Sequence, residues 1–184
     1  MHAFPSPVTA LRIVPARDGD LDRFIGLLEE VADWLHARGI HQWQPGSFRV
    51  SAEFYQASIR QGEIHLVVVG EALAGGLRLT RQDPVVWPDV PGDDALYVYN
   101  LAVRRAWANQ GLGRRILEWT EAKAGSLGKA CLRLDCMAHN GVLREYYRRA
   151  GFEARGEVDA HFPAPVGTLR LMRYEKRVTG AAIP

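Results

Sequence analysis

The spacing of apolar residues switches along the chain between the period of a helix and that of a strand. Large apolar residues recur every three or four positions over 21–35, which is typical of one face of an amphipathic helix. The run at 65–69 is rich in valine, and a turn at Gly70 leads into an alternating segment. We expect Asp18-Gly-Asp20 and Ser51 to cap the first two helices. The pattern predicts helices at 21–35, 51–61, 111–127 and 140–150, and strands at 11–14, 65–69, 72–81, 96–103, 131–137, 152–158 and 168–178.

This order of elements constrains the fold. Strands joined by short turns form antiparallel hairpins, whereas strand–helix–strand connections join parallel neighbours. We therefore expect an α/β fold with one mixed, mostly antiparallel sheet of about seven strands and helices on both faces. The 184 residues fit a single domain spanning 1–184.

The turn between the strand at 96–103 and the helix at 111–127 is typical of an anion-binding site. A helix start presents free backbone N–H groups and the positive end of the helix dipole. Arg114 and Arg115 lie in the first helical turn, where positive charge opposes that dipole, and a bound anion would explain their presence. The turn also contains small residues that let an anion approach the backbone, namely Ala108, Asn109, Gly111 and Gly113.

Two common phosphate-binding motifs do not fit this turn. A dinucleotide-binding Gly-x-Gly-x-x-Gly motif would need a glycine where Ile116 stands, and the chain contains no P-loop motif. The remaining candidate ligand is a pyrophosphate, such as the one that coenzyme A carries, held mainly by backbone groups of the protein.

The same residues resemble the GNAT superfamily of N-acyltransferases. The strand ends in Leu101-Ala102-Val103, and the segment from Ala108 to Gly113 is similar to the family motif Arg/Gln-x-x-Gly-x-Gly/Ala, except that Ala108 replaces the first residue. Further along, Asn140, Tyr147 and Gly151-Phe152 have the spacing of the family's second motif.

The resemblance implies that acetyl-CoA is the co-substrate and that an amine attacks its acetyl group directly. By the same resemblance, Tyr147 would be the general acid at the CoA sulfur, and the backbone of 101–103 would pair with the pantetheine arm. Gln110 or the flanking arginines could replace the side chain missing at Ala108. The implied cofactor-binding residues are Leu101, Ala102, Val103, Ala108, Asn109, Gln110, Gly111, Leu112, Gly113, Arg114 and Asn140.

The sequence constrains the acceptor and the general base less than it constrains the cofactor-binding residues. The family often has a glutamate in the strand that precedes the motif, and none stands in 96–101. A water relay or one of His41, His65, His139 and His161 could serve instead. The segment after the first helix often lines the acceptor site in this family, and the substrate-binding candidates are His41, Trp43 and Tyr99.

These polar and aromatic groups favour the primary amine of a small molecule as the acceptor. Two alternatives stay open. One is a catalytically silent acyl-CoA-binding sensor or partner domain of the same fold, and the other is an acetyltransferase that acts on protein N-termini or lysines.

Composition restricts the remaining partners. With 23 basic and 21 acidic residues, the net charge of +2 is too balanced to suggest nucleic-acid binding. No apolar run approaches the roughly 20 residues of a membrane span, so we expect a cytoplasmic protein without a membrane partner. The sequence is compatible with a homodimer. Cys131 and Cys136 would lie on opposite faces of one strand and stay reduced, and no zinc-ligand spacing exists, so no metal is expected.

Overall fold

The computed structural model describes residues 11–90, 93–163 and 166–178. These residues form a seven-stranded sheet with the strand order β1-β2-β3-β4-β5-β7-β6. Within it β4 and β5 run parallel, and the other neighbouring pairs are antiparallel. This arrangement confirms the predicted mixed, mostly antiparallel sheet. The strands are β1 (Leu11–Pro15), β2 (Ile64–Val69), β3 (Ala72–Thr80), β4 (Ala95–Val103), β5 (Cys131–Met137), β6 (Glu153–Phe162) and β7 (Gly167–Arg177).

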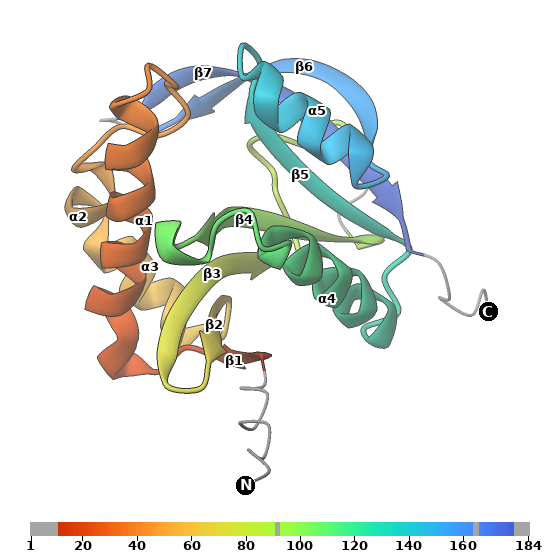
Figure 1. Cartoon of the computed structure of the whole chain (residues 1–184). Helices are drawn as coiled ribbons and strands as arrows, with labels where there is room; N and C mark the ends of the chain where they lie inside the picture. Colours follow the sequence, from red (N-terminus) through yellow and green to blue (C-terminus); the bar gives the residue numbers. More distant parts are fainter. Residues whose placement is uncertain (1–10, 91–92, 164–165, 179–184) are drawn as a thin grey trace, which may run out of the picture.

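Helices cover both faces of this sheet, as predicted (Figure 1). Neighbouring residues of β2 point to opposite cores: Leu66 packs against α1 and α3, whereas Val67 packs against α4. On the α4 side, α5 packs on β5 and β7 through the buried ring of Tyr147. The helical elements are η1 (Asp18–Asp20), α1 (Leu21–His36), α2 (Ser47–Val50), α3 (Ala52–Arg60), η2 (Arg105–Trp107), α4 (Leu112–Ser126) and α5 (Gly141–Arg149).

The short helix α2 was not predicted, and its stabilisation comes from a distant residue. Glu29 lies in the middle of α1 and is buried, and both of its carboxylate oxygens accept hydrogen bonds from the backbone around the start of α2. The donors are the N–H groups of Gly46, Phe48 and Arg49, at 2.6, 3.1 and 3.1 Å. A carboxylate at a helix start satisfies free N–H groups and complements the helix dipole.

The two predicted helix caps do not act as expected. Asp18–Asp20 forms a 3-10 turn, and the Asp20 carboxylate accepts from the N–H of Arg17 and from the Arg23 side chain. Ser51 lies at the start of α3, but its hydroxyl donates to the carbonyl of Ser47. In both places another partner competes for the side chain.

A β-bulge changes the course of β4. Its pairing with β3 shifts register between the pairs Gly76–Ala102 and Arg78–Tyr99, which leaves one extra residue on β4. Asn100 lies in this bulge with φ of 49°, a left-handed conformation that asparagine tolerates better than most residues. Bulges bend a strand and redirect its side chains, and this one lies where β4 leaves β5.

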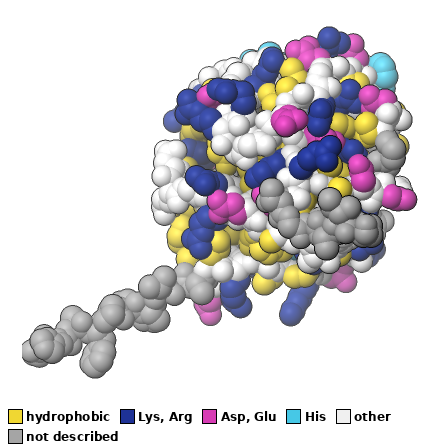
Figure 2. Space-filling view, turned by 90° about the vertical axis from the view of Figure 1, so that its right-hand side faces the viewer, with side chains coloured by type: hydrophobic (Ala, Val, Ile, Leu, Met, Phe, Trp, Pro, Cys, Tyr) yellow, Lys and Arg dark blue, Asp and Glu magenta, His cyan; other side chains and the backbone are white. Residues whose placement is uncertain are grey.

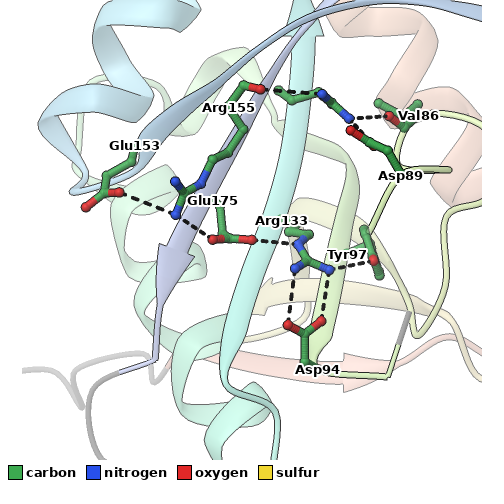
Figure 3. Close-up of polar contacts among 9 residues, drawn as sticks. Val86, Asp89, Asp94, Tyr97, Arg133, Glu153, Arg155 and Glu175 are labelled. Atoms are coloured by element: carbon green, nitrogen blue, oxygen red, sulfur yellow. Dashed lines mark hydrogen bonds and ion pairs between the residues drawn. The ribbon is translucent and has the colours of Figure 1, made fainter. Parts of the chain in front are cut away.

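Pairing between β4 and β5 is limited to the segments 95–97 and 131–133. Tyr97 and Arg133 form the last pair, and an ionic network around the buried Arg133 holds this end together (Figure 3). The Arg133 side chain is 4% exposed and donates to the Tyr97 hydroxyl at 2.9 Å, to Asp94 at 2.9 Å and to Glu175 at 2.8 Å. Beyond Arg133 the two strands diverge, as the ribbons in Figure 1 show.

Two further features bear on ligands. Among the described residues, no helix is long and apolar enough to cross a membrane, and no group of three or more His, Cys, Asp and Glu residues could hold a metal ion. Figure 2 shows Lys and Arg side chains interspersed with Asp and Glu side chains on one face. Cys131 and Cys136 are free and buried, and they lie in cores on opposite sides of the sheet, as predicted.

Candidate active site

A cleft of about 820 Å³ occupies the opening between β4 and β5. Because β4 and β5 do not pair there, residues from both faces of the sheet line the cleft. From the α4–α5 side come Leu112, Gly113, Tyr146 and Tyr147, and from the opposite side come Trp43, Phe54, Tyr99 and Asp135. The cleft therefore passes through the sheet.

The backbone of β4 forms one wall of the cleft. Leu101, Ala102 and Val103 line it, and on their other side Ala102 and Val103 pair with β3. No described residue of β5 pairs with these positions, so the polar backbone groups that point toward β5 are available to a ligand. An extended molecule with amide groups, such as a pantetheine arm, fits such an edge by strand-like pairing.

The start of α4 forms the end of this wall. Gly111 precedes the helix with φ of 73°, and Asn109 has φ of 60°. No side chain caps the helix start, and no acidic residue lies in its first turn, so its N–H groups can bind an anion. A side-chain carbon at Gly113 would lie 2.7 Å from the Tyr146 hydroxyl oxygen. Glycine therefore allows Tyr146 to pack on the helix start.

The arginines near this helix start differ in their partners. Arg114 lines the cleft, and its exposed side chain pairs with Glu118 at 2.9 Å. Arg105 also lines the cleft, with its guanidinium 3.6 Å from the centre of the Trp34 ring. Gln110 does not line the cleft, because its side-chain amide donates to the carbonyl of Ala106. Arg105 and Arg114 are thus better placed than Gln110 to substitute for the side chain missing at position 108.

Asn140 lines the cleft, but its polar atoms bind other parts of the protein. Its Oδ1 accepts from the Leu143 N–H at 3.1 Å and caps α5, and its Nδ2 donates to Gln42 at 3.0 Å. The same oxygen of Gln42 accepts from the N–H of Met137. Asn140 therefore positions α5 and, through Gln42, joins it to the segment after α1; Gln42 was not among the residues predicted from the sequence.

Tyr147 lies on the α5 side of the cleft and is 8% exposed. Its ring packs against Phe152 and Tyr174, with ring centres 6.0 and 5.7 Å apart. Burial, followed by the neighbouring Cys136 and Asp135, raises the pKa of the Tyr147 hydroxyl. The hydroxyl is therefore protonated at neutral pH, which is the state a proton donor needs.

Aromatic and polar side chains surround the other half of the cleft. Trp43 packs edge-on against Phe48 at 5.3 Å, and Tyr99 lies beside Arg78. The Arg78 guanidinium also lies over Phe54 and pairs with Glu63 at 2.8 Å. Burial raises the pKa of the nearby Tyr55 hydroxyl to about 12. This half offers flat apolar surfaces and hydrogen-bonding groups to a ligand.

The histidines expected as base candidates do not line the cleft. His41, proposed for substrate binding, is exposed, and its ring lies against His36 at 6.1 Å. His65 is buried beside Trp119, and burial lowers its pKa. His139 and His161 also lie outside the lining. We therefore withdraw His41 as a substrate-binding residue.

The cleft contains a carboxylate that was not among the site residues predicted from the sequence. Asp135 lines it from β5, and burial, followed by the charge of Asp83, raises the pKa of Asp135 to about 7. An acidic residue between the apolar residues Leu134 and Cys136 of a strand was the available signal.

Comparisons with known proteins show which family the chain belongs to. Residues 28–152 match the family model described as "Acetyltransferase (GNAT) family". The "Uncharacterized N-acetyltransferase YesJ" of Bacillus subtilis (strain 168) is 34% identical over 146 residues, which covers 77% of this chain and 81% of the relative.

Solved structures share the fold. A GNAT-family acetyltransferase from Listeria monocytogenes 4b F2365 superposes with a TM-score of 0.75 at 24% identity, covering 91% of this chain and 94% of that one. The PaiA N-acetyltransferase of Thermoplasma acidophilum, solved with coenzyme A, gives a TM-score of 0.67 at 17% identity, with 91% and 99% covered.

The chain belongs to the acetyltransferase (GNAT) family. The class of protein that its fold and cleft define is an acetyl-CoA-dependent acyltransferase, as the sequence motifs predicted.

The proposed pyrophosphate site at the start of α4 can be tested by a substitution that changes only the charge. Asn109→Asp keeps a residue that tolerates a positive φ and adds a negative charge at the proposed pyrophosphate site. We expect acetyl-CoA affinity to fall by roughly tenfold, or about 1.4 kcal/mol, in a calorimetric titration. The control Asn109→Gly, which adds no charge, should stay within about threefold of the parent. Equal affinities for a folded Asn109→Asp variant and the parent would contradict the site.

Proposed function

We propose that this protein transfers the acetyl group of acetyl-CoA to the primary amine of a small molecule. The observation that carries the proposal is the cleft that passes through the sheet. One half offers a free strand edge and an uncapped helix start, and the other half offers aromatic and polar side chains.

The residues of the first half would hold the co-substrate. The free edge at 101–103 binds the amide groups of pantetheine, and the N–H groups at the start of α4 bind the pyrophosphate. Arg105 and Arg114 add positive charge beside this anion. When bound, acetyl-CoA supplies the acetyl group as a thioester, and its sulfur leaves as a thiolate.

In this proposal Tyr147 assists the departure of the CoA sulfur. Its hydroxyl is protonated and lies on the α4–α5 side of the opening. Because the pKa of Tyr147 is raised and lies above that of a thiol, complete proton transfer from its hydroxyl to the thiolate is uphill. The hydroxyl therefore acts mainly as a hydrogen-bond donor that stabilises the negative charge on the departing sulfur.

The second half of the cleft supports a small acceptor. Three separate segments enclose it: the stretch after α1 with Trp43, α3 with Phe54, and the hairpin of β6 and β7 with Phe162. Gln42 accepts hydrogen bonds from Met137 at the end of β5 and from Asn140 at the start of α5, and these bonds tie the first segment across the cleft. A concave, mostly apolar surface that also carries a small number of polar groups is typical of a small-molecule site.

A panel of acceptors tests the proposed substrate class. Acetyl-CoA is supplied with small primary amines, with peptides bearing a free N-terminal serine or alanine, and with lysine peptides, and free thiol is measured. We expect at least one small amine to exceed every peptide by roughly 100-fold in kcat/KM. Faster transfer to the peptides would overturn the small-molecule acceptor. Tight acetyl-CoA binding without transfer to any member would favour a silent acyl-CoA-binding domain.

Tyr147→Phe isolates the hydroxyl, because the ring and its packing remain. We expect kcat to fall by roughly 10²- to 10⁴-fold, the usual scale for a lost acid, while acetyl-CoA affinity changes by less than about threefold. The control is Tyr174→Phe, whose buried ring packs against Tyr147 but does not line the cleft. It should keep kcat within about threefold of the parent. A Tyr147→Phe enzyme as fast as this control would remove Tyr147 from the chemistry.

A further inference from the structure

Asp135 lies on the face of β5 opposite to Tyr147. Leu134 and Cys136 point into the core that contains Tyr147, and alternation along the strand places Asp135 on the other face. On that face Tyr99 comes from β4, and both side chains line the cleft. The opening between the strands thus has a tyrosine hydroxyl on one side and a partly buried carboxylate on the other.

The cations near Asp135 are engaged elsewhere. Arg133, two residues earlier, binds Asp94, Tyr97 and Glu175. Arg173 stands opposite Asp135 in β7 and donates to Asp89 and to the carbonyl of Val86. Arg78 on β3 pairs with Glu63. None of the hydrogen bonds and ion pairs found among the described residues ends on the Asp135 carboxylate.

The charged and titratable groups around Asp135, on either face of the sheet, come from five elements. They are Asp83 in the loop after β3, Tyr99 on β4, Arg133 on β5, Arg173 on β7 and Tyr147 on α5. Asp83 is 6% exposed, and its Oδ1 accepts from the N–H groups of Val85 and Val86, which fix its position. A second carboxylate beside Asp135 disfavours its charge, and a cationic ligand would relieve this repulsion.

We propose that Asp135 is the catalytic base that binds the ammonium group of the acceptor and takes a proton from it. This inference rests on the proposed function and supplies the base for which the strand at 96–101 has no glutamate. At neutral pH a primary amine arrives as a cation, the form that a carboxylate without an ion-pair partner attracts.

The proton balance of this step is complete. One N–H bond of the ammonium breaks, its proton passes to a carboxylate oxygen of Asp135, and the electron pair stays on nitrogen. That pair forms the new N–C bond while the C–S bond breaks and leaves its electrons on sulfur. The nitrogen then loses a second proton to solvent, and the sulfur gains one proton from water or through Tyr147, which solvent then reprotonates. Asp135 returns its proton to solvent.

The kinetic test compares the parent with Asp135→Asn on an amine that the parent acetylates. The parent kcat/KM should rise with pH through a midpoint near 7, as Asp135 ionises. In Asp135→Asn we expect kcat/KM at neutral pH to be roughly 10²- to 10⁴-fold lower, with the remaining activity following the amine's own pKa. Acetyl-CoA affinity should stay within about threefold. The control Asp159→Asn, an exposed position on β6 outside the cleft, should keep the parent profile.

A second readout needs no substrate. The folded pKa of Asp135 lies above the value of about 3.9 for an unfolded aspartate, so the folded state holds its proton more tightly. The stability from this group is therefore complete below about pH 4 and is lost as pH rises toward 7. Relative to the parent, Asp135→Asn should gain unfolding free energy over this interval, measured by chemical denaturation.

The outcomes separate the two proposals. A parent that acetylates no amine overturns the proposed function. A parent that acetylates an amine, with Asp135→Asn within about threefold of it from about pH 6 to about pH 9, overturns only the base. A stability difference that does not change with pH would also overturn the inference, because Asp135 would then lack the perturbed environment on which it depends.

Discussion

The parting of β4 from β5 after three paired residues is the constraint on which the rest of the structure depends. Adjacent strands normally pair along their length, because buried N–H and C=O groups without partners cost free energy. Here the network around Arg133 holds the closed end, and the bulge at Asn100 redirects β4 just beyond it. The unpaired backbone thereby becomes a binding surface, and side chains from both faces of the sheet reach one cleft.

Two neighbouring carboxylates of α1 stabilise the surroundings of this opening. Glu29 binds the backbone at 46–49 and fixes the segment on the acceptor side. Glu30 accepts from the Arg104 side chain and the Arg105 N–H and fixes the turn that leads to α4. Successive helix residues point about 100° apart, so one helix can support both halves of the cleft.

Much of the fold and one half of the site could be predicted because their signals are local. The helix and strand periods, the turn before α4 and the spacing of Asn140 and Tyr147 each lie within one segment. The roles of Gln42 and Asp135 depend on distant segments: Gln42 binds residues after β5, and Asp135 is accessible only because β4 has moved away. No local sequence pattern predicts that His41 points outward while its neighbour Gln42 points into the cleft.

Amide hydrogen exchange with and without acetyl-CoA tests most directly whether the parted strand is the binding surface. At saturating acetyl-CoA, exchange should slow at the amides of 101–103 that point toward β5 and at those of 111–113 in the helix start. The amides of β1, at the far edge of the sheet, should exchange as before. Unchanged exchange at 101–103 and 111–113 in a protein that calorimetry shows to be saturated would contradict the account.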